Sequence, residues 1–199
     1  MKPDLSILIV TYNSTRLIGA LLATLGSELR SLAAEVIVVD NASADGTAQT
    51  IARDHPWVTL VASDTNLGFA AGNNLAATRA RGRYLLLLNP DASPLPGSLA
   101  RGIALMDQYP DAGLGGGELR GADGSRQPSA RMFPTLRDEL FTLSGLAARY
   151  PSSRLFARLD RRWADPEQAA EVDWIPGAFV FVRAADFAAL GGFDERFFM

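Results

Sequence analysis

The order of short apolar runs and helical segments is the feature of this sequence that most constrains its fold. The runs 5–10 and 36–39 are short and bounded by polar residues, which is typical of buried parallel strands. Between them, leucines recur at the spacing of a helix that buries one face: Leu17, Leu21, Leu22, Leu25 and Leu29. The unit then repeats, with helices predicted over 45–51 and 73–81 and strands over 58–61 and 84–88. This alternation predicts an α/β fold, a Rossmann-like and mostly parallel sheet flanked by helices.

The second half of the chain lacks this regular alternation of strands and helices. A helix is predicted over 98–108, and a glycine-rich stretch follows, with a hairpin or a long loop expected around Asp123-Gly124. Residues 137–160 favour helix with breaks at Gly145 and Pro151, while 174–182 favour a strand and 186–190 a short helix. We expect a single domain over 1–199, in which 1–110 and 111–199 form two halves.

Composition narrows the chemistry to carboxylates. The 199 residues include no cysteine and one histidine, His55, which excludes thiol catalysis, thiolate zinc sites and histidine-rich metal sites. A hydrophobic share of 48% is too high for a disordered chain. With 19 basic and 22 acidic residues the net charge is -3, so nucleic acid is not expected as a partner. No apolar run reaches the roughly 18 residues of a membrane helix.

Polar side chains follow every one of the four predicted parallel strands, at 11–13, 40–43, 64–66 and 89–91. Ligands of open α/β sheets bind at the carboxyl ends of strands, so these segments are candidate binding residues. The same residue types also favour turns and helix caps, and that alternative stays open for each single strand end.

Three of these residues have a specific chemical use. Asp40 directly follows a buried strand and could accept hydrogen bonds from a ribose hydroxyl or a base NH, or cap the next helix. Tyr12 offers a flat face for a base, although an aromatic side chain at a strand end is as often part of the core. Asp91 is the best metal candidate, because Mg²⁺ and Mn²⁺ prefer oxygen ligands and commonly bridge phosphates.

Five stretches together resemble a known enzyme family. They are SILIVTYN (6–13), VVDNAS with DGT (38–47), NLGFAAGNN (66–74), DGS through FPT (123–135) and the pair GA (177–178) with GGFDE (191–195). The first three are similar to family-two inverting glycosyltransferases, and the rest to their rhamnosyltransferase-like branch. The match runs in order through nearly the whole chain.

The resemblance implies a GT-A fold, the nucleotide-diphospho-sugar transferase fold. It implies transfer of a sugar, with rhamnose favoured, from a nucleoside diphosphate to a hydroxyl group with inversion, in cell-surface polysaccharide synthesis. The nucleotide-sugar-binding residues that it implies are Thr11, Tyr12, Asn13, Asp40, Asn66, Gly68, Asn73, Asn89 and Asp91. Asp91 would hold the Mg²⁺ or Mn²⁺ on the diphosphate, while a carboxylate base removes the acceptor proton.

The sequence departs from the family pattern at two places. The usual Asp-x-Asp is Asn89-Pro90-Asp91, which leaves one metal carboxylate. The acidic base motif of the family follows the GGFDE stretch, and we expect it beyond Met199, in a chain truncated before it. Asp194 and Glu195 are weak candidates for a catalytic role, and they could instead contact the acceptor, hold the site together or cap a turn. The alternative function is a catalytically silent nucleotide-sugar-binding or assembly module. A nucleotidyltransferase would need a glycine-rich, basic start, which 11–16 lacks.

The expected partners follow from the same resemblance. They are a dTDP- or UDP-type sugar and a glycan or lipid-linked acceptor, while the oligomeric state stays open. Arginines gather at Arg149, Arg154, Arg158, Arg161 and Arg162, where a helix would present them to anionic lipid or to solvent. We expect a cytoplasmic location, with a peripheral contact at the inner face of the membrane as a hypothesis.

Overall fold

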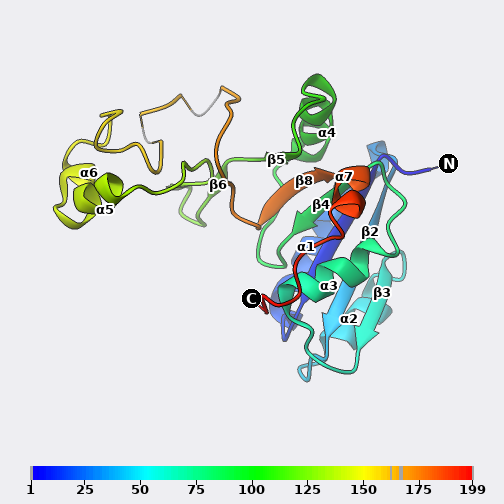
Figure 1. Ribbon diagram of the computed structural model, residues 1–199. Coiled ribbons are helices and arrows are strands. Elements are labelled where there is room, and N and C mark those ends of the chain that lie inside the picture. The colour runs from blue at the N-terminus through cyan, green and yellow to red at the C-terminus, as the bar shows by residue number, and fades with distance from the viewer. Residues whose placement is uncertain (1, 162, 166–167, 199) are drawn as a thin grey trace. The chain divides into compact units, whose positions relative to one another are not determined.

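The computed structural model describes residues 2–161, 163–165 and 168–198, and it divides into two compact units. Unit 1 is Met1–Gly115 with Gly177–Met199, and unit 2 is Gly116–Pro176. Unit 1 contains the large sheet, and unit 2 contains a small hairpin and two short helices (Figure 1). The expected single domain over 1–199, with its division near residue 110, stays a prediction.

The sheet of unit 1 has the order β3-β2-β1-β4-β8-β5. Its strands are β1 (Leu5–Thr11), β2 (Ala34–Asn41), β3 (Thr59–Ser63), β4 (Tyr84–Leu88), β5 (Leu114–Gly116) and β8 (Phe179–Arg183). The first four strands are parallel, as the alternation of apolar runs predicted, and β8 runs antiparallel to β4. The carboxyl ends of β1, β2, β3 and β4 therefore lie at one edge of the sheet.

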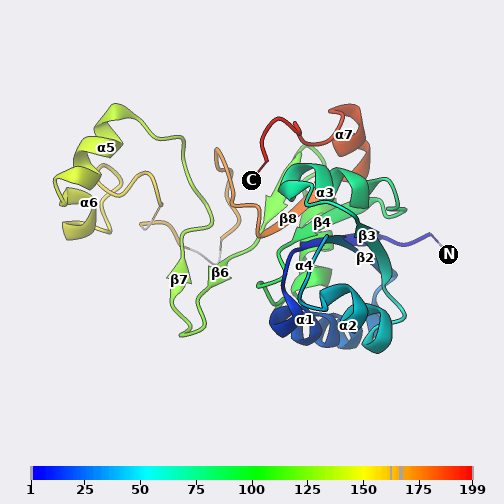
Figure 2. The ribbon, with the colours of Figure 1, turned by 90° about the horizontal axis from the view of Figure 1, so that it is seen from below.

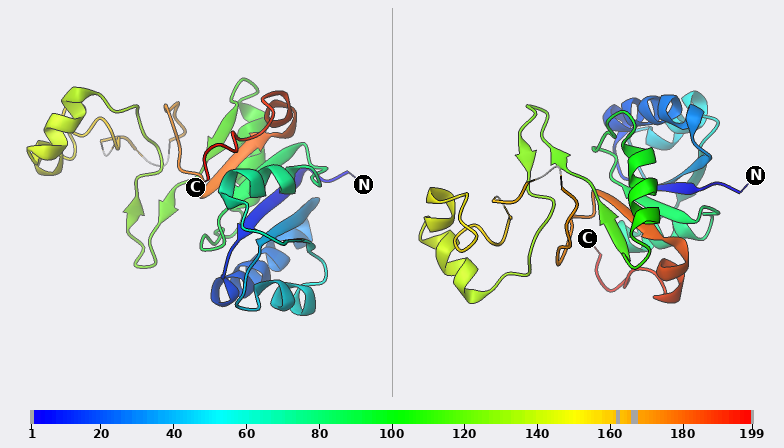
Figure 3. Two further views of the ribbon diagram at one scale, coloured as in Figure 1. Left: turned by 60° about the horizontal axis from the view of Figure 1, so that its bottom comes forward. Right: turned by 90° about the horizontal axis from the view of Figure 1, so that it is seen from above.

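Helices cover both faces of this sheet. They are α1 (Thr15–Glu28) with the 3-10 turn η1 (Leu29–Ser31), α2 (Thr47–Asp54), α3 (Gly68–Ala77), α4 (Ser98–Gln108) and α7 (Ala184–Ala189). Figures 2 and 3 show α1 and α2 on one face of the sheet and α3 and α7 on the other. The main core forms where alternate residues of β1, β2 and β4 pack against α1, α2 and α4. This three-layer arrangement confirms the predicted Rossmann-like α/β fold.

Two details of the predicted helices are wrong. Leu17 is exposed, and Ile18 takes its place beside Leu21, Leu22 and Leu25 on the buried face of α1. The helix predicted over 73–81 spans Gly68–Ala77 instead. Its first turns are built from glycine and alanine, and such small residues let α3 approach the sheet closely. A Cβ atom at Gly72 would lie 2.8 Å from Val10 Cγ1.

Unit 2 contains the predicted hairpin, formed by β6 (Leu119–Arg120) and β7 (Arg126–Gln127). Two helices follow, α5 (Leu136–Leu143) and α6 (Leu146–Arg149), separated at Gly145 as predicted. The prediction of helix after Pro151 is wrong, because 151–161 form turns. Within these turns the Ser153 hydroxyl accepts hydrogen bonds from backbone N–H groups, which competes with helical bonding. The arginines of this segment therefore share no helix face, and Arg162 lies outside the described residues.

Candidate functional site

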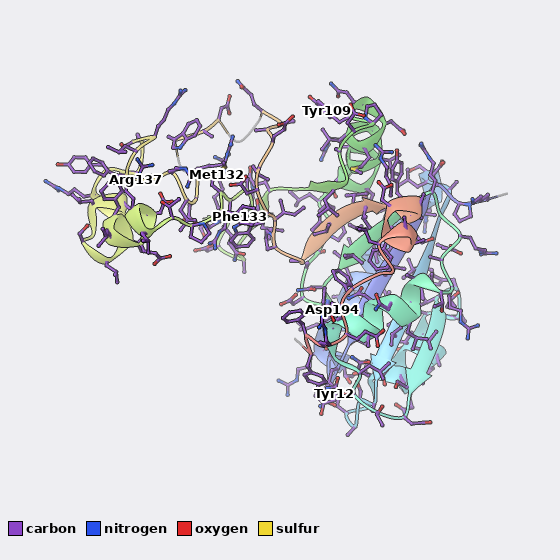
Figure 4. The ribbon with its side chains drawn as sticks, in the orientation of Figure 1. Tyr12, Tyr109, Met132, Phe133, Arg137 and Asp194 are labelled. Carbon is purple, nitrogen blue, oxygen red and sulfur yellow. The ribbon has the colours of Figure 1, made fainter. Side chains whose placement is uncertain are left out.

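A cleft of about 460 Å³ opens at the carboxyl edge of the parallel strands in unit 1. Six of the predicted site residues line it: Thr11, Tyr12, Asn66, Gly68, Asn89 and Asp91. Figure 4 shows Tyr12 beyond the end of β1, where its side chain is exposed. Other residues that line the cleft, which the site prediction did not include, are Val10, Ser14, Leu17, Asn41, Phe69, Pro90 and Phe198.

The loop after β1 is held on the loop after β2 by hydrogen bonds. The Asn13 N–H donates to Ser43 Oγ at 2.8 Å, and Asn13 Oδ1 accepts the N–H of Ala44 at 2.9 Å. Asn13 adopts a φ of 49°, a left-handed conformation that asparagine tolerates better than most residues. Asn13 therefore fixes the two loops against each other and is not among the residues that line the cleft.

Asp45 stabilises the same pair of loops through a network at the start of α2. Its carboxylate accepts hydrogen bonds from the hydroxyl and N–H of Thr47 and from the N–H of Thr15. These bonds favour the ionised form, so they lower the pKa of Asp45 to about 2, with the Thr47 hydroxyl making the largest contribution. The carboxylate is therefore ionised at neutral pH and binds the two loops together.

Three buried polar atoms at the ends of β1 and β2 have no hydrogen-bond partner among the described residues: Thr11 Oγ1, Asp40 Oδ1 and Asn41 Oδ1. Thr11 and Asp40 are direct neighbours in the parallel register. The other carboxylate oxygen of Asp40 accepts the Ser43 N–H at 3.1 Å. Buried polar atoms normally have partners, so an unpartnered group of this kind is a place for a ligand to donate hydrogen bonds.

Strand alternation explains why Asn41 lines the cleft. Val36, Val38 and Asp40 share the face covered by α1 and α2, so Asn41 points to the opposite face, where α3 packs. Its Nδ2 donates to the carbonyl of Gly68 at 3.1 Å. The alternation of side chains along β2 could have identified Asn41 from the sequence. Asp40, on the other face of the strand, does not line the cleft.

The start of α3 forms a second wall of the cleft. Asn66 Oδ1 accepts the N–H of Gly68 at 2.9 Å, and Gly68 has a φ of 76°. The next N–H, of Phe69, donates to the Phe198 carbonyl at 3.3 Å. A Cβ atom at Gly68 would lie 2.1 Å from that carbonyl oxygen. Glycine is therefore required here both by its backbone conformation and by the close approach of the chain.

The two asparagines of α3 make hydrogen bonds within the protein. Asn73 is buried, does not line the cleft, and donates to the Phe69 carbonyl one turn earlier. Asn74 binds the segment 193–195: its Oδ1 accepts the N–H of Phe193, and its Nδ2 donates to the Phe193 carbonyl and to Glu195 Oε1. Asn73, which was predicted to bind the nucleotide, therefore bonds within its own helix. Its neighbour Asn74 connects α3 to the segment 193–195, which is distant along the chain.

Asp194 and Glu195 lie outside the cleft and are engaged by other side chains. Arg196 donates to both oxygens of Asp194, and these hydrogen bonds hold the pKa of Asp194 below its ordinary value. A lowered pKa makes a carboxylate a weaker base. Figure 4 labels Asp194, which is exposed.

Asp91 is the metal candidate of the cleft. It follows β4, is exposed, and makes no side-chain hydrogen bond or ion pair within the described ranges. Asn89 anchors this turn, since its N–H donates to the Ala178 carbonyl at 3.1 Å. No group of three or more His, Asp or Glu side chains suited to a metal occurs among the described residues. One free carboxylate fits a divalent cation whose other ligands are phosphate oxygens and water.

Comparison with known proteins agrees with this architecture. Residues 6–161 match the family described as Glycosyl transferase family 2. The N-acetylglucosaminyl-diphospho-decaprenol L-rhamnosyltransferase of Mycobacterium tuberculosis is 30% identical over 215 residues, covering 100% of this chain and 67% of that protein. The succinoglycan biosynthesis protein ExoO of Rhizobium meliloti is 35% identical over 107 residues, covering 53% of this chain and 30% of that protein.

Solved structures show the same fold. The mannosyltransferase PcManGT from Pyrobaculum calidifontis, in complex with GDP-Man and Mn²⁺, aligns with a TM-score of 0.68 at 22% identity, over 98% of this chain and 48% of its own. S. aureus TarS 1-349 aligns with a TM-score of 0.61 at 22% identity, over 96% and 50%. This chain thus spans about half the length of these structures. Its fold is the GT-A fold, and the chain belongs to glycosyl transferase family 2.

Proposed function

We propose that unit 1 binds a nucleoside diphosphate sugar in the cleft and presents its sugar for transfer to a hydroxyl acceptor. The observation that carries the proposal is that two residues lining the cleft, Thr11 and Asn41, have buried side-chain oxygens without a hydrogen-bond partner among the described residues. Asp40, beside Thr11 in the parallel register, has a third such oxygen. A nucleoside offers base NH and ribose hydroxyl donors to such acceptors. Tyr12 is an exposed aromatic side chain on the same wall and gives a base a surface to stack on.

The diphosphate would lie near Asp91. Asp91 would hold a Mg²⁺ or Mn²⁺ ion, and Asn89 and Asn66 supply amides on the same cleft walls. A divalent ion bound there supplies positive charge that stabilises the leaving diphosphate. The structures of PcManGT with GDP-Man and Mn²⁺ and of TarS with UDP-GlcNAc support this assignment by analogy of fold.

The proposed reaction is transfer with inversion. The acceptor oxygen forms the new bond to the anomeric carbon opposite the diphosphate, which leaves with the electron pair of the broken bond. The acceptor proton passes to a carboxylate base. We do not propose Asp194 or Glu195 for this role, because Arg196 and Asn74 hold them.

We propose a deoxythymidine or uridine diphosphate donor with rhamnose favoured, and a lipid-linked glycan as acceptor in cell-surface polysaccharide synthesis. The match of this chain to 67% of a mycobacterial rhamnosyltransferase whose name specifies a diphospho-decaprenol acceptor supports these choices. A reaction of dTDP-rhamnose with a polyprenyl-diphosphate N-acetylglucosamine, followed by mass spectrometry, tests them. Transfer from UDP-galactofuranose in preference to dTDP-rhamnose would contradict the sugar assignment.

The first experiment measures thermal unfolding with dTDP, UDP, GDP or CMP, each with Mn²⁺, Mg²⁺ or a chelator. A ligand at a hundred times its Kd stabilises the folded state by about 2.7 kcal/mol, which raises the Tm by about 5–10 °C in a chain of this size. We expect the rise with dTDP or UDP, with metal present.

Three variants assign the rise to the cleft. Asp40→Asn and Asp91→Asn should abolish or strongly reduce it, while Asp111→Asn, an exposed aspartate after α4, is the matched control. If no nucleotide shifts the Tm, or if the control loses the shift as Asp91→Asn does, the assignment of the cleft is wrong.

A second candidate function is nucleotide-sugar binding without transfer. The observation that favours it is the engagement of Asp194 by Arg196, with its lowered pKa, which makes this carboxylate a poor base. Nucleotide-dependent stabilisation of the protein, combined with no release of UDP or dTDP from a sugar donor in the presence of acceptor, would support this candidate over transfer.

A further inference from the structure

Helix α5 in unit 2 buries an aspartate and exposes its leucines, the opposite of a helix that covers a hydrophobic core. Asp138 is 2% exposed, whereas Leu136, Leu140 and Leu143 are 87%, 65% and 83% exposed. Aspartate is almost never fully buried unless it is paired, and three leucines so exposed on one short helix form an apolar patch. The distribution therefore needs an explanation within this helix and outside it.

The buried side of α5 is explained by local bonds. Asp138 and Thr135 form a capping box, and Arg158 Nη1 donates to Asp138 Oδ2 at 2.8 Å. Phe141 packs edge-on against Phe156, with ring centroids 4.8 Å apart. This inward side faces the segment 150–158 and α6, which lies beside α5 (Figure 2).

The outward side consists of Leu136, Leu140 and Leu143, which we call the leucine face. These residues follow one another at steps of four and three, so they lie on the same side of the helix. Phe133, labelled in Figure 4, precedes the helix and is also exposed. This apolar strip lies on a two-turn helix whose buried aspartate is paired with Arg158, and it is suited to contact an apolar surface.

Exposed basic side chains occur on α5, on α6 and in the segment that follows them. Between 133 and 161 the exposed charged side chains are Arg137, Arg149, Arg154 and Glu139, an excess of positive charge. Arg137 lies on α5 itself, one residue after Leu136. Arg158 is engaged by Asp138. The chain as a whole has a net charge of -3, so this local excess is opposite in sign to the rest.

We propose that the leucine face docks unit 2 on an anionic lipid bilayer, with Arg137, Arg149 and Arg154 contacting acidic headgroups. Leucines on one helix face with arginines beside them are the combination by which interfacial helices bind membranes. The chemistry favours lipid over an acidic protein, because the apolar strip would insert among acyl chains while the arginines meet phosphates. The choice of a lipid surface rests in part on the proposed function, whose lipid-linked acceptor is found at such a surface.

The test is co-sedimentation of the full chain with vesicles of phosphatidylcholine alone or with phosphatidylglycerol added. We expect stronger binding to the anionic vesicles, and weaker binding at high salt. Leu140→Ser/Leu143→Ser should lower the partition coefficient at least about tenfold, because two leucine side chains leave the acyl region. Arg137→Gln should lower binding to anionic vesicles about fivefold.

Matched controls come from unit 1. Leu190→Ser removes another leucine that is 82% exposed, and Arg79→Gln removes another exposed arginine, and both should bind vesicles like the unmodified chain. Because all of these side chains are exposed, the variants should fold, and circular dichroism checks this.

Equal binding to neutral and anionic vesicles would overturn the proposal, as would equal loss in the leucine-face and control variants. Sedimentation velocity without lipid tests whether a second copy of the chain covers the leucine face instead. A dimer that Leu140→Ser/Leu143→Ser converts to monomer would show that it does. The nucleotide-dependent rise in Tm is measured separately without vesicles. Vesicle binding without a nucleotide-dependent rise in Tm would overturn only the proposed function. A nucleotide-dependent rise in Tm without vesicle binding would overturn only the lipid docking.

Discussion

Single side chains at the strand ends hold the cleft loops in place before any ligand binds. Asn13 and Asp45 connect the loop after β1 with the loop after β2, and each does so through backbone N–H groups. Bonds of this kind satisfy the backbone of two turns that would otherwise be mobile. The loops are therefore preorganised, and the ordering cost on nucleotide binding is smaller.

Asp45 gives this preorganisation a pH dependence. Its pKa is about 2 in the folded protein, below the ordinary value of an aspartate, so the folded state binds the proton more weakly than the unfolded state. Its contribution to stability is thus complete above about pH 4 and is lost as the pH falls toward 2. Asp45→Asn should unfold at a lower temperature than the unmodified chain at pH 7, with the difference shrinking toward pH 2.

Asp64→Asn is the control for that titration, because Asp64 is exposed in the loop after β3. Its Tm should follow that of the unmodified chain at every pH. A constant Tm difference between Asp45→Asn and the unmodified chain from pH 7 down to pH 2 would show that the Asp45 carboxylate stabilises nothing through its charge.

At the residue level, the sequence predicted which side chains lie at the strand ends but not which way neighbouring side chains point, and the binding roles of these residues stay predictions. Thr11, Tyr12 and Asp91 line the cleft because strand ends in a parallel sheet share one edge. Asn73 was predicted beside them, but it faces its own helix and bonds to Phe69. Which way a helical side chain points depends on where the helix begins, and the sequence placed that start five residues too late.

At the scale of elements, α3 shows how small residues set the shape of the cleft. The glycines of its first turns lie before the helix that was predicted over 73–81, and glycine weakens an isolated helix. Contact with β1 outweighs this propensity, because Gly72 permits an approach to Val10 that a larger residue would block. Helices with a clear apolar periodicity, such as α1, were predictable, whereas the start of a helix stabilised by close packing was not.

Gly68→Ala is the sharpest test of this element. The substitution introduces a Cβ at a φ of 76° and places it 2.1 Å from the Phe198 carbonyl oxygen, so either the turn or the segment at 198 must move. We expect a loss of about 1–3 kcal/mol in the free energy of unfolding, measured by urea denaturation. The nucleotide-dependent rise in Tm should fall as well, because both residues line the cleft.

Gly191→Ala separates the cost of the backbone conformation from the cost of the close contact with residue 198. Gly191 has a φ of 79° but open space around the added Cβ, so it reports backbone strain alone. Gly113→Ala, with open space and no positive φ, should be close to neutral. If Gly68→Ala costs no more than Gly191→Ala, the close approach of residue 198 does not constrain the start of α3.

At the scale of the whole molecule, the two units are stabilised by different means. Every residue of the main hydrophobic core belongs to unit 1. Among the described residues of unit 2, only Asp138 and Ala157 are buried, and much of its order comes from ion pairs and from arginines stacked on tryptophans. The sequence shows a change of pattern after residue 110, but it does not give the bounds of unit 2, because these depend on contacts between residues distant along the chain.

In the described chain no helix has both the length and the apolar character of a membrane span.

The location of the core predicts that unit 1 folds without unit 2. Gly116 lies against Ile175, so the two ends of unit 2 are close enough to be joined by a short Gly-Ser linker that replaces 117–175. We expect the shortened chain to unfold cooperatively, because the packing of β1, β2 and β4 against α1, α2 and α4 is unchanged. It should also show the same rise in Tm with nucleotide and metal as the full chain, since every residue that lines the cleft is retained.

Asp91→Asn in both the shortened and the full chain is the matched control, and it should remove the rise in each. Cooperative unfolding without a nucleotide response would mean that unit 2 contributes to donor binding, since the cleft residues are intact. Loss of cooperative unfolding would mean instead that the core of unit 1 depends on unit 2, against the separation of buried residues between the two. The leucine face leaves with unit 2, so the shortened chain should also fail to sediment with anionic vesicles, whereas a shortened chain that still binds them would place the lipid contact in unit 1.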